Sequence, residues 1–200
     1  MESDMELLGK LVLICVMGSF LLGAAYSTAG ENPRVLIRTS EGDITLELYP
    51  DKAPASVENF LAYVNEGFYE GVIFHRVIKN FMIQCGGFDK DFNRKETHPP
   101  IVNEAANGLK NKRGTISYAR TGVINSATSQ FFINHKDNPF LDHTGDSPQE
   151  YGYAVFGKVV DGMDIVDKIA GTKTHTYRGL QDVPVKKVVI KKAEVITAEK

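Results

Sequence analysis

Apolar and polar side chains alternate over much of this chain, which is the pattern of β-strands with one buried face. Ile44, Leu46 and Leu48 alternate with charged or polar neighbours. A Glu-Gly pair at 41–42 separates this run from an apolar run at 35–39, so the two runs are expected to form a hairpin. Further strands are predicted over 72–78, 82–86, 114–119, 129–134, 154–159 and 185–195.

Two segments carry helical periodicity instead. Pro54 suits the first turn of a helix, apolar residues recur at helical spacing over 57–64, and Gly67 is placed to end the helix. A second helix is predicted over 163–170, with Asp161 as its N-cap and a glycine after it. The sequence therefore predicts eight strands and two helices in a mainly β fold.

Two of the predicted strands have one face that mixes polar and apolar side chains. Because side chains alternate along a strand, Met82 and Gln84 share a face, and so do Gln130 and Phe132. Each of these residues alone is typical of a core or of a solvated edge, and only their combination indicates a pocket. The opposite faces are expected to fill the core and carry Ile83, Cys85, Phe131 and Ile133.

Phe81 and Arg76 lie close to these faces in the sequence, so the pocket is expected to be a shallow apolar hollow with hydrogen-bond donors at its edge. No acid–base pair is present among these residues. Chemistry that breaks a covalent bond is therefore not indicated.

Five motifs in the same order resemble the cyclophilin family of peptidyl-prolyl cis-trans isomerases. They are FHRVIKNFMIQCGG, GTISYA, SQFFIN, NPFLD and YAVFGKV, and the resemblance extends from about residue 35 to about residue 196. The loop after Leu141 and the segment YGYAVFGKVV are most similar to bacterial exported members. The resemblance implies a closed eight-stranded antiparallel β-barrel capped by two α-helices, with the working site on the outer wall.

The resemblance also implies the residues of the site. Arg76 is implied as the catalytic residue. The residues implied to bind the substrate are Phe81, Met82, Gln84, Ala119, Arg120, Gln130, Phe132, Phe140, Leu141 and Tyr153.

Rotation about a peptide bond has a barrier of about 18–20 kcal/mol, and exchange at a bond before proline takes tens of seconds or more. A catalyst needs only to favour the twisted amide over the planar forms. Arg76 can donate a hydrogen bond to the prolyl nitrogen without losing its own proton. We therefore expect proline-containing peptides and folding proteins as partners, and neither a cofactor nor a covalent intermediate.

Three positions depart from the pattern best known in eukaryotic members. Arg120 replaces an Asn, Phe140 replaces a Trp and Tyr153 replaces a His. Because a Phe lacks the indole N–H of Trp, we expect weak cyclosporin binding with isomerisation retained.

The first 29 residues have the composition of an export signal. Residues 11–25 are apolar except for Ser19, which is shorter than the about 20 residues of a membrane-spanning helix. Ser27 and Ala29 suit cleavage before Gly30, although acidic residues precede the apolar run. A start at Met5 would remove two of these acids. We expect a signal peptide at 1–29, a domain at 30–200 and a periplasmic location, with an inner-membrane anchor as the alternative.

Charge, cysteine content and histidine spacing bear on nucleic-acid binding, disulfides and metal sites. Without residues 1–29 the chain has 22 basic and 22 acidic residues, which predicts no general attraction to nucleic acid. We expect a monomer. Cys85 is then the only cysteine, so an internal disulfide is impossible, and the five histidines do not have metal-ligand spacing. The two functions left open are an isomerase that assists folding as a chaperone and a proline-peptide binding module in which catalysis is incidental.

Overall fold

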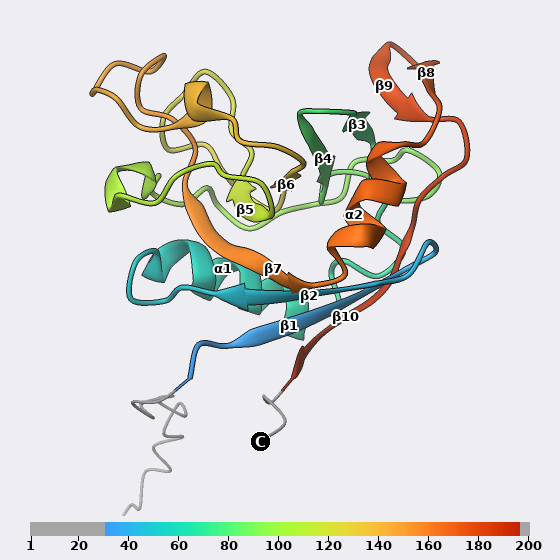
Figure 1. The fold of residues 1–200 in the computed structure, drawn as a ribbon, viewed down its shortest axis with the longest axis horizontal. Helices are drawn as coiled ribbons and strands as arrows, with labels where there is room; N and C mark the ends of the chain where they lie inside the picture. The colour runs from blue at the N-terminus through green and yellow to red at the C-terminus, as the bar shows by residue number, and fades with distance from the viewer. Residues whose placement is uncertain (1–30, 197–200) are drawn as a thin grey trace, which may run out of the picture. The chain divides into compact units, whose positions relative to one another are not determined.

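Eight antiparallel strands form the main sheet, in the spatial order β10–β1–β2–β7–β5–β6–β4–β3 (Figure 1). The structure is a computed structural model that describes residues 31–196, so the predicted signal segment and its boundary lie outside the described residues. The strands are β1 Arg34–Thr39, β2 Asp43–Leu48, β3 Arg76–Ile78, β4 Met82–Cys85, β5 Thr115–Tyr118, β6 Phe131–Asn134, β7 Val155–Asp161 and β10 Ile190–Ile196.

The predicted first hairpin is confirmed. β1 and β2 pair with Arg38 opposite Asp43, and Ile44, Leu46 and Leu48 are fully buried. Phe60, in the helix that covers the sheet's apolar face, packs edge-on against Phe131 of β6. The ring centroids are 5.3 Å apart, and both rings are fully buried. Burial of large apolar rings such as these stabilises the fold.

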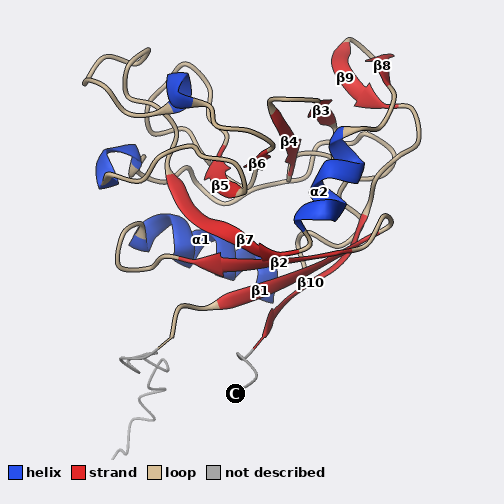
Figure 2. Cartoon of the chain, viewed as in Figure 1, coloured by secondary structure: helices blue, strands red, loops and turns tan. Residues whose placement is uncertain are grey.

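Two α-helices pack on the sheet, and two short 3-10 helices, η1 Ala105–Asn107 and η2 Pro139–Leu141, interrupt the long loops (Figure 2). α1 Pro54–Asn65 begins at its proline, as predicted, and contacts β10. α2 Met163–Ala170 contacts β2, β3 and β4. No helix within residues 31–196 has both the length and the apolar character that crossing a membrane requires.

The predicted cap of α2 is wrong. β7 continues through Asp161, which pairs with Thr45 of β2, and the helix is entered from Gly162 instead. Gly162 has a left-handed φ of 85°, and a Cβ at this position would lie 2.2 Å from the carbonyl oxygen of Asp43. A glycine is therefore required at the point where the chain leaves the sheet.

The sheet is a strongly curved half-barrel and not the closed barrel that we predicted. β10 and β3 form no ladder with each other. An isolated bridge between Ile73 and Val189 and a few backbone hydrogen bonds join residues 71–74 to residues 188–190. The predicted strands 72–78 and 185–195 are regular only from Arg76 and Ile190 onward. The parts that would have completed the barrel are irregular.

A second, two-stranded sheet consists of β8 Thr174–Tyr177 and β9 Leu180–Pro184. Its turn is formed by Arg178 and Gly179, which have positive φ angles of 49° and 79°. Two consecutive positive φ angles are characteristic of a tight hairpin turn. This hairpin was not predicted, and it places β9 in contact with β3, where Arg76 lies (Figure 1).

Candidate active site

A row of three side chains crosses the outer face of β3, β4 and β6. Gln84 on β4 is directly opposite Arg76 on β3 and directly opposite Phe132 on β6. Side chains of residues that oppose each other in a ladder are on the same face of the sheet. Arg76, Gln84 and Phe132 are therefore brought together, as the alternation in the sequence predicted.

An apolar cluster separate from the main core lies next to this row. Met82, Phe132 and Leu141 are its buried members, with exposed fractions of 2%, 4% and 8%. Phe81, Ala119, Tyr153 and Ile78 surround them. The residues predicted for the opposite face, Ile83, Cys85, Phe131 and Ile133, all belong to the main core.

The short helix η2 brings Phe140 and Leu141 to this cluster. Leu141 turns inward, whereas Phe140 is 68% exposed and stacks on Phe81 with ring centroids 5.6 Å apart. Asn138 Nδ2 just before the helix donates a hydrogen bond of 2.9 Å to the Phe81 carbonyl oxygen. This bond ties the helix to the start of β4, so the two phenylalanines form one edge of the hollow.

Tyr153 and Arg120 lie on another side of the apolar cluster. The Tyr153 ring contacts Phe132 edge-on at 5.8 Å between centroids, and the Arg120 guanidinium carbon lies 4.9 Å from the centre of the Tyr153 ring. Arg120 also donates hydrogen bonds to the carbonyl oxygens of Gly152 and Pro148. Its guanidinium therefore holds the loop that carries Tyr153.

Two glutamines form the polar edge of the hollow. Gln84 Nε2 donates a hydrogen bond of 3.0 Å to Gln130 Oε1, and the Ala119 N–H donates one of 2.9 Å to the Gln130 carbonyl oxygen. The Gln84–Gln130 bond fixes the orientation of both amides. The Ala119 N–H is used within the fold, so a peptide ligand would have to bind other main-chain groups there.

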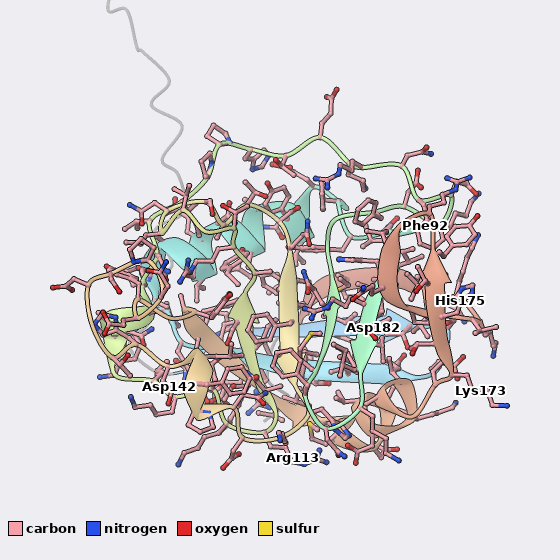
Figure 3. The ribbon with its side chains drawn as sticks, turned by 90° about the horizontal axis from the view of Figure 1, so that it is seen from above. Phe92, Arg113, Asp142, Lys173, His175 and Asp182 are labelled. Atoms are coloured by element: carbon pink, nitrogen blue, oxygen red, sulfur yellow. The ribbon has the colours of Figure 1, made fainter. Side chains whose placement is uncertain are left out.

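Arg76 is half-exposed and points along this edge. Its guanidinium carbon lies 5.8 Å from the centre of the Phe81 ring, and its Nε lies 4.0 Å from Asp182 Oδ2 on β9. Figure 3 shows Asp182 from above. Sequence reasoning missed Asp182 because the hairpin that carries it was not predicted.

His75, the neighbour of Arg76, is buried with an exposed fraction of 5%. Burial lowers the pKa of its imidazole to about 4, and the positive charges of Arg76 and Arg94 also lower it. The imidazole is therefore neutral at pH 7. Within residues 31–196, no group of three or more His, Cys, Asp or Glu side chains is placed to hold a metal ion.

Comparison with known proteins identifies the class of protein. Residues 34–195 match the family model described as cyclophilin type peptidyl-prolyl cis-trans isomerase/CLD. The peptidyl-prolyl cis-trans isomerase cyp18 of Streptomyces antibioticus is 57% identical over 162 residues, which are 81% of this chain and 98% of that protein. Peptidyl-prolyl cis-trans isomerase A of Dickeya dadantii is 51% identical and covers 96% of this chain and 97% of its own length.

Solved structures agree with the sequence comparisons. A cyclophilin-type isomerase from Cryptosporidium parvum has a TM-score of 0.69 at 27% identity, over 84% of this chain and 99% of that one. The same protein was also solved in the presence of the dipeptide Ala-Pro, with a TM-score of 0.68 at 28% identity over 82% of this chain and 99% of that one. The chain belongs to the cyclophilin family and is a peptidyl-prolyl cis-trans isomerase.

Proposed function

We propose that Arg76 accelerates rotation about X-Pro bonds by donating a hydrogen bond to the prolyl nitrogen of the twisted amide. When the amide twists, its nitrogen regains a lone pair and becomes a better acceptor. A donor aimed at that atom favours the transition state over both planar forms. The observation that supports this proposal is the row of Arg76, Gln84 and Phe132 across three adjacent strands.

The apolar cluster of Met82, Phe132 and Leu141 would hold the proline ring. A hydrogen bond to a charged group contributes about 1.5–3 kcal/mol, which corresponds to about one to two powers of ten in rate. A larger acceleration requires that the ring be fixed while the glutamine edge holds the rest of the peptide. The hollow and the guanidinium therefore act together.

We further propose that the substrates are proline-containing segments of exported proteins during folding. A related isomerase has been solved in the presence of Ala-Pro, which is the smallest peptide of this kind. The apolar run 11–25, followed by Ser27 and Ala29, supports export to the periplasm, with an inner-membrane anchor as the alternative. Cell fractionation combined with sequencing of the mature N-terminus distinguishes the two.

The mechanism is tested by replacing Arg76 with Ala and with Lys and measuring isomerisation of a short X-Pro peptide. We expect Arg76→Ala to lower kcat/KM by about ten- to hundred-fold. Lys keeps the charge but loses the planar guanidinium, so Arg76→Lys should recover only part of the loss. Because Arg76 is half-exposed, the melting temperature should change little.

Two further variants complete this test. Arg38→Ala removes a guanidinium from β1 and is the matched control. Phe132→Ala removes the buried ring and should weaken both peptide binding and turnover. An Arg76→Ala enzyme that isomerises the peptide at the wild-type rate would eliminate the mechanism.

A further inference from the structure

A groove of about 340 Å³ lies next to Arg76, on the side of the β8–β9 hairpin. His75, Phe88 and Gln130 line one part of it, and residues 179–181, at the end of the hairpin turn and the start of β9, line another. Gln130 also belongs to the edge of the proline hollow through its bond with Gln84. The groove and the proline hollow are therefore contiguous, and a peptide chain that reaches past the proline can enter the groove.

The two sides of the groove are tied to each other. Phe92, in the loop after Phe88, packs against Tyr177 of β8 with ring centroids 4.7 Å apart. Arg178 Nη1 in the hairpin turn donates a hydrogen bond of 3.0 Å to the Asp91 carbonyl oxygen. Figure 3 shows Phe92 and His175 on these neighbouring segments. These contacts fix the separation of the two sides, so the groove is a built feature of the fold.

The groove is lined by positive charge. Arg76 and Arg94 both contribute guanidinium groups, and no carboxylate of residues 31–196 lines it. Arg94 is exposed, lies with its guanidinium carbon 5.4 Å from the centre of the Phe88 ring, and has no ion-pair partner among residues 31–196. Stacking on Phe88 holds the Arg94 guanidinium while leaving its N–H groups available.

The carboxylates adjacent in the chain to groove-lining residues already have partners. Asp182 pairs with Arg76, and Asp89 accepts hydrogen bonds from the N–H groups of Asp91 and Asn93 within its own loop. The Arg94 guanidinium at the groove is therefore not compensated by a carboxylate of residues 31–196.

Building on the proposed function, we propose that this groove is a specificity subsite that binds an acidic side chain of the peptide substrate near the isomerised proline, with Arg94 as its main anchor. A carboxylate pairs with a guanidinium through two parallel hydrogen bonds, so Arg94 suits a Glu or Asp side chain. The enzyme therefore prefers substrates that carry an acidic residue at one fixed distance from the proline.

The test uses a series of X-Pro peptides in which Glu is placed in turn at each position from three residues before the proline to three after it, with a matched Gln peptide for each. Isomerisation is measured at low and high salt. For the wild-type enzyme we expect one position at which the Glu peptide has about five-fold higher kcat/KM than its Gln partner, which corresponds to about 1 kcal/mol for a partly exposed ion pair. High salt should reduce this ratio.

Variants assign the preference to Arg94. Arg94→Gln should bring the ratio of Glu to Gln peptide close to one, and Arg94→Glu should produce a preference for a Lys peptide at the same position. Lys52→Gln removes one positive charge from the loop before α1 and should leave the wild-type ratio unchanged.

Several outcomes would overturn the subsite. A wild-type enzyme with no preference at any position would do so, as would a preference that persists in Arg94→Gln. Turnover of the neutral Gln peptides reports on the isomerase mechanism separately, because it does not involve the Glu side chain. If the Gln peptides are not isomerised, dissociation constants for the same series, measured by calorimetry, still give the ratio that tests the groove.

Discussion

Arg76 on β3 and Asp182 on β9 face each other across two sheets, with Nε of the arginine 4.0 Å from Oδ2 of the aspartate. Asp182 has a positive φ of 59° within its strand. The contact joins the strand that carries the guanidinium to the hairpin that borders the groove. Asp182 is thus placed to orient Arg76 without being placed in the apolar hollow itself.

We expect Asp182→Asn to lower kcat/KM by no more than about five-fold, because an exposed ion pair contributes about 0–1 kcal/mol. Asn tolerates a positive φ, so the hairpin should keep its shape. The loss should fall on kcat rather than on KM, since a mobile guanidinium weakens transition-state stabilisation more than ground-state binding. Peptide kinetics and thermal unfolding measure these quantities.

Asp51→Asn, in the exposed turn before α1, is the matched control for the loss of one negative charge. A hundred-fold fall in kcat/KM for Asp182→Asn would contradict a purely positioning role. An unchanged kcat would show that the pair does not orient Arg76 in solution.

The site could be predicted from the sequence to the extent that it depends on strand alternation. The period of two placed Met82 and Gln84 on one face and Ile83 on the other, and the structure agrees. The ladders through Gln84 then bring Arg76 and Phe132 to the same face. Local pattern was sufficient here because each strand has one buried face, which fixes its register.

The β8–β9 hairpin could not be predicted in the same way. All four residues of β8 are exposed, so the segment has no apolar face to produce a recognisable alternation. Its turn depends on Arg178 in a left-handed conformation, which is uncommon for a residue other than glycine. The groove and the Arg76–Asp182 contact depend on this hairpin, so they too were visible only in the structure.

Gly87 gives a way to disturb Gln130 without changing it. A Cβ at Gly87 would lie 2.6 Å from Gln130 Nε2, which belongs to a flexible side chain that can move away. We expect Gly87→Ala to fold normally but to displace the Gln130 amide and break its 3.0 Å bond with Gln84. A neutral hydrogen bond contributes about 1 kcal/mol, so kcat/KM should fall by about five-fold.

Gly171→Ala is the matched control, because a Cβ there would make only ordinary contacts, with its nearest neighbour 3.4 Å away. Nuclear magnetic resonance of the side-chain amides would report the displacement of Gln130 directly. The expectation fails if the Gln130 amide resonances shift while peptide turnover stays at the wild-type level.

Phe140 sets the expected response to cyclosporin. It is exposed and stacked on Phe81, so a larger ring fits at this position without repacking the core. Phe140→Trp adds an indole N–H and should tighten cyclosporin binding by about five-fold, as expected for one hydrogen bond of about 1 kcal/mol. Isomerisation of short peptides should change little. Inhibition constants for the two proteins measure the difference, and a wild-type constant in the nanomolar range would contradict the expectation of weak binding.

We expect the buried His75 to make the folded protein less stable in mild acid. Burial is the main reason that the pKa of its imidazole falls from the ordinary value of 6.5 to about 4 in the folded state. The unfolded chain therefore binds a proton between these pH values while the folded chain does not, so the stabilisation is complete above pH 6.5 and is lost as the pH falls toward 4. The shift corresponds to a loss on the order of 3 kcal/mol.

Replacing His75 with Phe removes this titration and keeps an aromatic ring against Phe88, whose centroid lies 4.9 Å from that of the imidazole. Urea unfolding at pH 7.5, 5.5 and 4 should show that the free energy of unfolding decreases less in His75→Phe than in the wild type. His175→Phe, on the exposed strand β8, controls for the loss of a histidine as such. Carboxylates titrate in all three proteins, so their contribution cancels in the comparison. If the free energy of unfolding depends on pH in the same way in wild type and His75→Phe, the buried imidazole gains its proton as readily in the folded chain as in the unfolded one, and the prediction is wrong.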